Sequence, residues 1–261
     1  MKIKVLQFVV GDYDVPGNWF SKHVEPINRM YCDTHGYGYV SERLGSPETL
    51  PLRDRERGLH WLKVPLMHRH LHNCDFLLYL DADCLFYNHL FRIEEELLPL
   101  MSYGNKIQHD KPCQDRTGNE YSMLFADDVL NETIRPATTN INSGVCLVRN
   151  NETSRRILER WDAATDVPGL EFTRWEHPND QLGFMYGAYP YHRPDVRIMK
   201  DYYLVQGRWG YFIRHICLYI TNPALRDGEF RSIFTSPIMQ RNRILNRLSK
   251  NERSDSTCSV R

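Results

Sequence analysis

The most constraining feature of the sequence is a short apolar run that ends in two aspartates. Residues 76–80 (FLLYL) are all apolar or aromatic, and Asp81 and Asp83 follow directly, separated by Ala82. Such a run is typical of a strand that is covered on both faces of a sheet. A buried carboxylate has to be paired or bind a metal. The segment therefore predicts a buried strand with two carboxylates at its carboxyl end.

Length and composition restrict the class of protein. A chain of 261 residues with 41% hydrophobic and 25% charged residues is long enough for one large globular domain with a sizeable core. Lys and Arg together number 33, as do Asp and Glu, so the zero net charge gives no electrostatic case for nucleic-acid binding. The seven cysteines include no Cys-x-x-Cys pair, which favours reduced thiols over a disulfide framework or a zinc site. We find no transmembrane or signal segment, and expect a soluble, cytoplasmic protein.

The order of the predicted elements indicates an α/β fold. Besides 76–80, strands are expected over 4–10, 37–43, 141–150, 196–205 and 211–220; helices over 18–35, 58–72, 152–164, 176–188 and 237–250; and a polar loop over 47–57. Gly36 should end the first helix, and Asn150 or Asn151 should cap the third. Early alternation of strands and helices, followed by a less regular order, predicts a mixed sheet. We expect one catalytic domain over 1–235, with a basic helix and polar tail over 236–261.

The aspartate pair lies where an open α/β sheet binds its ligands, at the carboxyl end of a strand. Carboxylates two residues apart on an extended segment can both reach one divalent cation. Mg²⁺ and Mn²⁺ favour oxygen ligands and often bridge to substrate phosphates. The alternative is a surface turn in which the two aspartates cap the next helix. The apolar strand that precedes the pair favours a metal–diphosphate site.

Several segments, taken in order, resemble one enzyme family. Residues 60–88 (HWLKVPLMHRHLHNCDFLLYLDADCLFYN) resemble the Asp-x-Asp region of GT-A glycosyltransferases, above all the retaining galactosyl-, xylosyl- and mannosyltransferase-like family of fungal and plant polysaccharide synthesis. The other similar segments are HGYGY (35–39), NINSGVCLVRN (140–150), HPNDQLGF (177–184) and YFIRHICLY (211–219). The resemblance extends roughly from Lys4 to Thr221. It implies a GT-A, Rossmann-like nucleotide-diphospho-sugar transferase fold with a mixed, mostly parallel central sheet.

The resemblance also implies a metal site. Asp83 is expected to coordinate the cation directly, and Asp81 to contact the metal shell or the donor ribose. His215 corresponds to the family's metal-binding histidine, and a neutral imidazole suits Mn²⁺. His215 could instead be a core histidine, and His192 is the rival third ligand. We expect Mn²⁺, or Mg²⁺, as cofactor.

Donor-binding residues follow from the same comparison. Lys63 corresponds to a contact with the donor phosphate or sugar, although a solvated helix lysine is the alternative. Val9 and Tyr13 are expected to meet the nucleotide, by backbone and stacking contacts. Asn142 and Gly144 would border the donor pocket, with the glycine allowing a close backbone approach.

The catalytic residues implied by the resemblance are Asp180 and Gln181. Retaining transfer needs a carboxylate nucleophile, or a front-face reaction in which the leaving phosphate activates the acceptor hydroxyl. Gln181 could stabilise positive character at the sugar. Asp180 could be the nucleophile, or only a first-turn helix residue that interacts favourably with the helix dipole. The sequence leaves these alternatives open.

The function expected is transfer of a hexose, or a pentose, from a nucleotide diphosphate sugar to a carbohydrate acceptor, with UDP as the favoured nucleotide. The membrane anchor usual in the family has no counterpart here, which favours a soluble enzyme of a viral or microbial kind. One alternative is a haloacid-dehalogenase-type phosphatase, with Asp127 and Asp128 as its later acidic pair, although that motif normally sits in the first strand. A second alternative is a non-catalytic carbohydrate-binding protein on a transferase scaffold.

Overall fold

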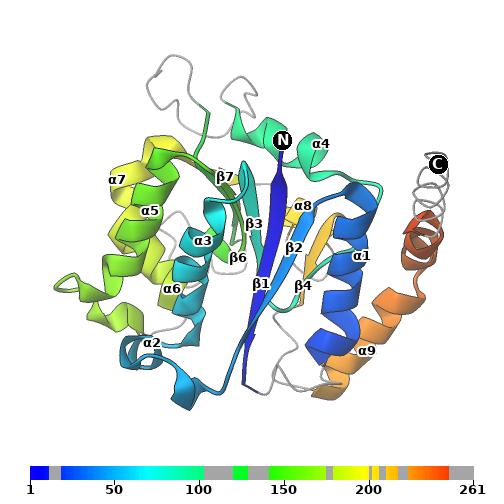
Figure 1. Ribbon diagram of the computed structural model, residues 1–261, viewed down its shortest axis with the longest axis horizontal. Helices are drawn as coiled ribbons and strands as arrows, with labels where there is room; N and C mark the ends of the chain where they lie inside the picture. The colour runs from blue at the N-terminus through cyan, green and yellow to red at the C-terminus, as the bar shows by residue number, and fades with distance from the viewer. Residues whose placement is uncertain are drawn as a thin grey trace, which may run out of the picture.

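The centre of the molecule is a six-stranded sheet in the order β2–β1–β3–β6–β5–β7 (Figure 1). The computed structural model describes residues 1–11, 19–102, 120–128, 141–174, 179–199, 202–205, 210–216 and 223–246. The strands are β1 (Ile3–Val10), β2 (Gly38–Leu44), β3 (Phe76–Leu80), β5 (Met123–Asp127), β6 (Ile141–Arg149) and β7 (Val196–Met199). All run in one direction except β6, which is antiparallel to β3 and β5. The predicted α/β fold with a mixed, mostly parallel sheet is confirmed.

The carboxyl ends of the parallel strands gather several polar residues at one edge of the sheet. Strand β3 ends directly before Asp81, and β5 ends directly before Asp128. Because β6 runs the other way, it begins at this edge, with Leu80 opposite Val145 and Asp127 opposite Ile141. The segment 142–144 therefore lies between the two aspartates that end β3 and β5.

Both faces of the sheet are covered, which explains the continuous apolar run in β3. On one face, Leu77 and Tyr79 pack with side chains of α3 (Lys63–Leu71) and α5 (Glu152–Asp162), and with a π-helix over Phe184–Ala188. On the other face, Leu78 and Leu80 pack with α1 (Glu25–His35), α4 (Ile93–Glu96) and α8 (Tyr202–Val205). Figure 1 shows α3 and α5 on one side of the sheet and α1 on the other. The remaining helices are α2 (Leu52–Arg57), α6 (Asn179–Gly183), α7 (Tyr189–His192) and α9 (Pro223–Thr235).

A second, two-stranded sheet continues from the aspartate pair. Strand β4 (Cys84–Phe86) pairs antiparallel with β8 (Ile213–His215), which places Cys84 directly opposite His215. Buried amide side chains attach this ribbon to the main sheet. Gln7 of β1 donates to the carbonyls of Asp81 and Cys84 at 2.9 and 3.1 Å. Asn28 of α1 donates to Gln7 Oε1 at 2.8 Å and to the Cys84 carbonyl at 2.9 Å, and accepts from the Phe86 N–H at 2.9 Å.

The ends of several elements confirm the sequence signals. Gly36 follows α1 with a φ of 76°, a left-handed conformation that favours glycine at a helix end. Asn151 caps α5, because its side chain accepts from the backbone N–H of Ser154 at 2.8 Å. The Ser154 hydroxyl in turn accepts from the Asn151 N–H. Of the two asparagines considered as the cap, Asn151 is therefore the correct one.

Two predictions about secondary structure are wrong, and two strands were missed. The expected strand over 196–205 ends at Met199, and Tyr202–Val205 is the short helix α8. The expected loop over 47–57 contains α2, which is anchored by ion pairs of Arg57 with Asp54 and Asp162 at 2.8 and 2.6 Å. Strands β4 and β5 were not expected at all. Strand β4 has only three residues, so tertiary pairing, more than local pattern, determines its conformation.

The described part of the C-terminal region packs on the body of the protein. A helix over 237–246 follows α9, and Phe230 and Met239 join a buried cluster with Val9 and Phe20. The boundary at 235/236 between a catalytic domain and a tail stays a prediction. Among the residues that the structure describes, no helix combines the length and apolar character needed to cross a membrane.

Candidate active site

The aspartate segment forms a tight turn at the carboxyl edge of the sheet. The backbone N–H of Asp81 donates to the carbonyl of Gly144 at 2.8 Å, and the N–H of Cys84 donates back to the carbonyl of Asp81 at 2.9 Å. These bonds, with the Gln7 amide on the carbonyls of Asp81 and Cys84, fix the backbone of the turn. The two carboxylates therefore have defined directions.

Asp81 points into a buried cluster centred on Lys63. The Lys63 ammonium lies 3.1 Å from Asp81 Oδ1, 3.0 Å from Asp180 Oδ2 and 3.1 Å from Ser143 Oγ. An ammonium has three protons to donate, and three acceptors surround this one. Tyr79 also donates its hydroxyl to Asp81 Oδ1, at 2.6 Å. The cluster joins the aspartate turn to the segment that carries Asp180.

The charges in this cluster stabilise each other. Burial would lower the pKa of Lys63, but the carboxylates of Asp180 and Asp81 outweigh it and raise the pKa above its usual value. Burial would raise the pKa of Asp81, but Lys63, His215 and the Tyr79 hydroxyl outweigh it and lower that pKa. Lys63 and Asp81 are therefore both charged at neutral pH, even though only 2% of the lysine side chain is exposed.

Asp83 points the other way, toward His215. His215 Nε2 lies 3.2 Å from Asp83 Oδ1, and both side chains are buried. Burial would lower the pKa of His215, but Asp83 and then Asp81 raise it above its usual value. The rival His192 instead pairs with Asp195 at 3.6 Å, just before the amino end of β7 and so at the opposite edge of the sheet. Of the two histidines, the structure brings only His215 to the aspartates.

Gly144 is the point at which the two parts of the site meet. A Cβ added at this position would fall 2.4 Å from His215 Cε1 and 2.9 Å from Asp81 Oδ2. Only glycine leaves room for both side chains here. Asp81 and His215 therefore both lie against Gly144, and Asp83 is held beside His215, although these residues come from a turn and from a distant strand.

Asp180 and Gln181 lie on the first turn of α6, against β6. Ser143 donates its hydroxyl to Asp180 Oδ2 at 2.7 Å, and its backbone N–H donates to Gln181 Oε1 at 3.2 Å. The Gln181 amide donates to Asp128 Oδ2 at 3.0 Å. Trp161 holds the backbone beneath, because its indole N–H donates to the Asp180 carbonyl at 2.8 Å. Both predicted catalytic residues thus lie beside the aspartate turn.

The remaining predicted contacts lie at the same edge or outside the described residues. Asn142 is half-buried, and its Oδ1 accepts from the Gly144 N–H at 2.9 Å. Val9 lies near the carboxyl end of β1 with its side chain buried in the core, which leaves only its backbone for a ligand. Tyr13 lies outside the residues that the structure describes.

The convergent side chains suit a divalent cation. Asp81 and Asp83 offer carboxylate oxygens and His215 offers an imidazole nitrogen, a set that first-row transition metals accept. Asp81 already has Lys63 as a counter-charge, whereas Asp83 is paired with an imidazole. With Asp180 included, three carboxylates face one ammonium and one imidazole, so a cation would offset acidic charge at this edge of the sheet.

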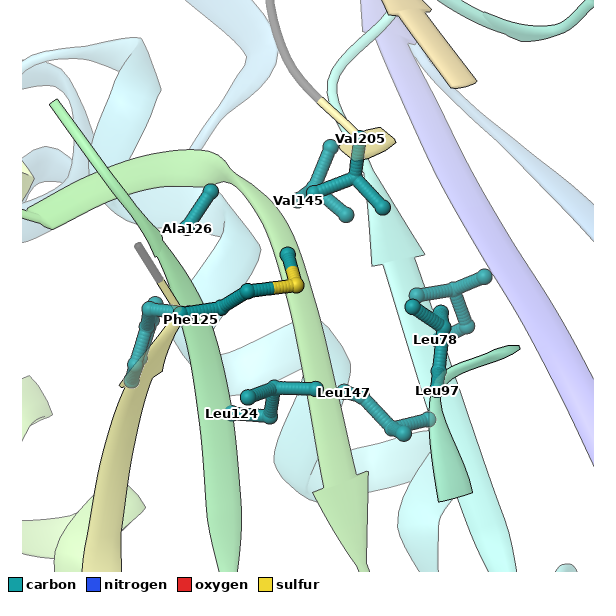
Figure 2. A pocket seen from close by; sticks show the side chains of 9 residues that line it. Leu78, Leu97, Leu124, Phe125, Ala126, Val145, Leu147 and Val205 are labelled. Atoms are coloured by element: carbon teal, nitrogen blue, oxygen red, sulfur yellow. The ribbon is translucent and has the colours of Figure 1, made fainter. Parts of the chain in front are cut away.

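An apolar pocket elsewhere is not part of this site. Figure 2 shows it among Leu78, Leu97, Leu124, Phe125, Ala126, Val145, Leu147, Met199 and Val205. No lining side chain carries a polar group, so the pocket lacks what a nucleotide diphosphate needs for recognition.

Fold and site together define a glycosyltransferase of the GT-A class. The profile of the galactosyl transferase GMA12/MNN10 family matches residues 11–212, and the chain belongs to that family. No curated protein matches the sequence. Family membership makes the chain a glycosyltransferase, so it does not support the phosphatase or the non-catalytic binding protein considered from the sequence.

Two solved structures are similar to this chain. The chain is similar to a glycosyltransferase involved in the glycosylation of the major capsid of PBCV-1, with 14% identity, a TM-score of 0.59, and coverage of 88% of this chain and 99% of that one. It is also similar to the galactosyltransferase LgtC, with 13% identity, a TM-score of 0.46, and coverage of 90% of this chain and 97% of that one. The first of these likenesses supports the GT-A fold.

Sequence reasoning missed the uncharged residues that build the site. Ser143 joins Lys63 to Asp180, and Gln7 and Asn28 hold the aspartate turn from below. Asp128 was considered only as part of an alternative enzyme, yet it accepts from Gln181. The one indication in the sequence was a polar residue within an apolar segment. Gln7 interrupts the hydrophobic strand β1, and the structure shows that it is fully buried.

Proposed function

We propose that the protein transfers a hexose from a UDP-linked donor to a carbohydrate acceptor, with retention of configuration and with Mn²⁺ as cofactor. The observation that carries the proposal is that His215 lies beside both aspartates at the carboxyl edge of the sheet: it pairs with Asp83 and meets Asp81 against Gly144. This is the edge where open α/β sheets bind nucleotides.

Asp81, Asp83 and His215 are the residues that would hold the cation. The imidazole favours Mn²⁺ over Mg²⁺, because nitrogen ligands suit transition metals better than they suit magnesium. When bound, the cation would neutralise charge on the departing diphosphate. The protein's own contribution is to hold Asp81 as a carboxylate, through Lys63 and Tyr79, and to exclude water from the buried side.

Lys63 and Asp180 are better suited to positioning than to direct contact with the donor. All three protons of Lys63 face protein acceptors, so a donor phosphate would have to displace one of them. Oδ2 of Asp180 accepts from both the Lys63 ammonium and the Ser143 hydroxyl, which reduces the strength of this carboxylate as a nucleophile. We therefore favour front-face transfer, in which the leaving phosphate activates the acceptor hydroxyl.

Gln181 is the residue placed to assist at the donor sugar. Its side chain is 8% exposed, and its amide is oriented by Ser143 on one side and Asp128 on the other. The carbonyl oxygen of an amide can stabilise developing positive charge on a sugar without forming a bond to it. Asp128 would add negative charge beside the same position.

Incubation with a panel of nucleotide sugars tests the proposal. With Mn²⁺ present, UDP-hexoses should be hydrolysed slowly or transferred to added oligosaccharides, and NMR of the product should show the donor's anomeric configuration. A chelator, or the Asp83→Asn variant, should abolish turnover. Turnover that persists with chelator present would contradict metal dependence. Turnover only with GDP-sugars would contradict the choice of UDP, and an inverted product would contradict retention.

A further inference from the structure

Cys84 lies beside the proposed cation site, and the pairing of β4 with β8 brings its thiol to His215. It follows Asp83 directly and stands opposite His215 in the β4–β8 ribbon. Directly opposed residues in an antiparallel pair have their side chains on the same face, with Cβ atoms about 5 Å apart. The thiol is fully buried and lies 3.5 Å from the Gly144 carbonyl, to which it donates.

The ligand atoms of Asp83, Cys84 and His215 lie within 4.8 Å of one another. His215 Nε2 and Asp83 Oδ1 are 3.2 Å apart, which is close to the roughly 3.3 Å expected between two tetrahedral ligands about 2.0 Å from a zinc ion. A thiolate, an imidazole and a carboxylate are all ligands that Zn²⁺ accepts, and three protein ligands leave a fourth position open.

We propose that Asp83, Cys84 and His215 form a site for Zn²⁺ and similar thiol-seeking cations such as Cd²⁺ and Co²⁺. The sulfur distinguishes this site from the oxygen- and nitrogen-based set proposed for Mn²⁺, which uses Asp81 in place of Cys84. Soft and borderline cations gain from a thiolate, whereas Mn²⁺ gains little. On binding, the metal–sulfur bond replaces the S–H bond, and the thiol proton leaves to solvent.

Occupation by zinc should inhibit the enzyme, an expectation that rests on the proposed function. Zinc drawn toward Cys84 takes Asp83 and His215 away from Mn²⁺ and shifts the cation off Asp81. The donor diphosphate then has no cation in position to neutralise its charge. Zn²⁺ should therefore inhibit Mn²⁺-dependent turnover competitively with respect to Mn²⁺, and Cys84→Ala should relieve the inhibition.

X-ray absorption at the zinc edge tests the site in the wild-type protein without any substitution. One sulfur at about 2.3 Å, together with nitrogen or oxygen ligands at about 2.0 Å, is the expected shell at one equivalent of zinc. A shell that contains only nitrogen and oxygen would overturn the proposal. So would two or more sulfurs, because they would indicate a different cysteine site.

Co²⁺ titration of variants identifies the sulfur. Wild type should show a thiolate-to-cobalt charge-transfer band, which Cys84→Ala should lose. The matched control is Cys146→Ala, which removes an equally buried thiol from β6 and should keep the band. Zinc affinity should fall at least tenfold in Cys84→Ala, while Mn²⁺ affinity should change less than threefold. A band that survives in Cys84→Ala would overturn the proposal.

Mn²⁺-dependent UDP binding, measured on the same samples, separates the two proposals. If UDP binding requires Mn²⁺ but zinc shows no sulfur ligand, the zinc site is wrong and the transferase site stands. If zinc binds through Cys84 but Mn²⁺ has no effect on UDP binding, the zinc site stands and the proposed metal dependence fails.

Discussion

Buried charge is balanced differently on the two sides of the aspartate turn, the side that faces α3 and the side that faces the β4–β8 ribbon. On the α3 side, Lys63 satisfies Asp81 and Asp180 inside the protein, with Ser143 between them. On the ribbon side, Asp83 is paired with His215, and neutral amides hold the backbone. On the first side one ammonium meets two carboxylates, whereas on the second a single carboxylate meets an imidazole. A buried carboxylate alone therefore does not define a metal site; its counter-charge has to be considered as well.

Removal of the lysine should have the largest effect on stability. Lys63→Met leaves Asp81 and Asp180 buried without their cation, which should cost about 3–5 kcal/mol of unfolding free energy. Lys4→Met is the matched control, because Lys4 is also buried but only donates to the His70 carbonyl at 2.9 Å. It should cost less than about 1.5 kcal/mol. Equal losses in urea unfolding would show that Lys63 does not hold the α3 side together.

Removal of the buried Asn28 amide should destabilise the ribbon side. Asn28→Ala removes bonds to the Cys84 carbonyl, the Phe86 N–H and Gln7, and should cost about 3 kcal/mol. Because the turn that carries Asp83 then loses support, Mn²⁺ affinity should fall by about tenfold or more.

The control residue is Asn242, which supports the segment that follows β4. Asn242 donates to the Tyr87 carbonyl and accepts from the His89 N–H, at 2.9 and 3.2 Å. Asn242→Ala should destabilise the protein by about 2 kcal/mol, yet change Mn²⁺ affinity by less than about threefold. Calorimetric titration of both variants checks this. A larger loss of affinity in Asn242→Ala would contradict the specific role of Asn28.

Mild acid should lower the stability of the fold through His89, which lies just beyond β4. Burial lowers the pKa of His89 to about 3, whereas an unfolded histidine titrates near 6.5. Below about pH 6.5 the His89 imidazole becomes protonated in the unfolded state but stays neutral in the folded state. The contribution of His89 to stability should therefore fall by about 1.4 kcal/mol per pH unit as the pH decreases toward 3. Over pH 6.5–5 the raised pKa of Lys63 and the lowered pKa of Asp81 keep their pair charged.

His89→Leu removes this titration. Urea midpoints at pH 7 and pH 5 should differ less in the variant than in the wild type. An unchanged difference would assign the acid sensitivity to another group.

The sequence predicted the parts of the molecule in which local pattern and tertiary structure agree. The run 76–80 is a strand with the predicted bounds, and Gly36 ends α1 as its backbone freedom suggests. The sequence could not show that Lys63 has all its protons occupied, because its partners come from three segments that only the fold brings together. The same holds for Cys84 and His215, which are neighbours only because β4 pairs with β8. The second half of 196–205 has strand-like residues, but Val196–Met199 pairs with the sheet and Tyr202–Val205 is helical.

The most direct test of the account is a Mn²⁺ titration of UDP binding to wild type and Asp83→Asn. Asparagine keeps the shape of the side chain and removes its charge. The account predicts that Mn²⁺ strongly increases UDP affinity in the wild type and has no such effect in the variant. The unfolding free energies should agree within about 1 kcal/mol, because the asparagine amide can still hydrogen-bond with His215. Equal UDP binding by both proteins with Mn²⁺ present, or wild-type binding that a chelator leaves unchanged, would contradict the account.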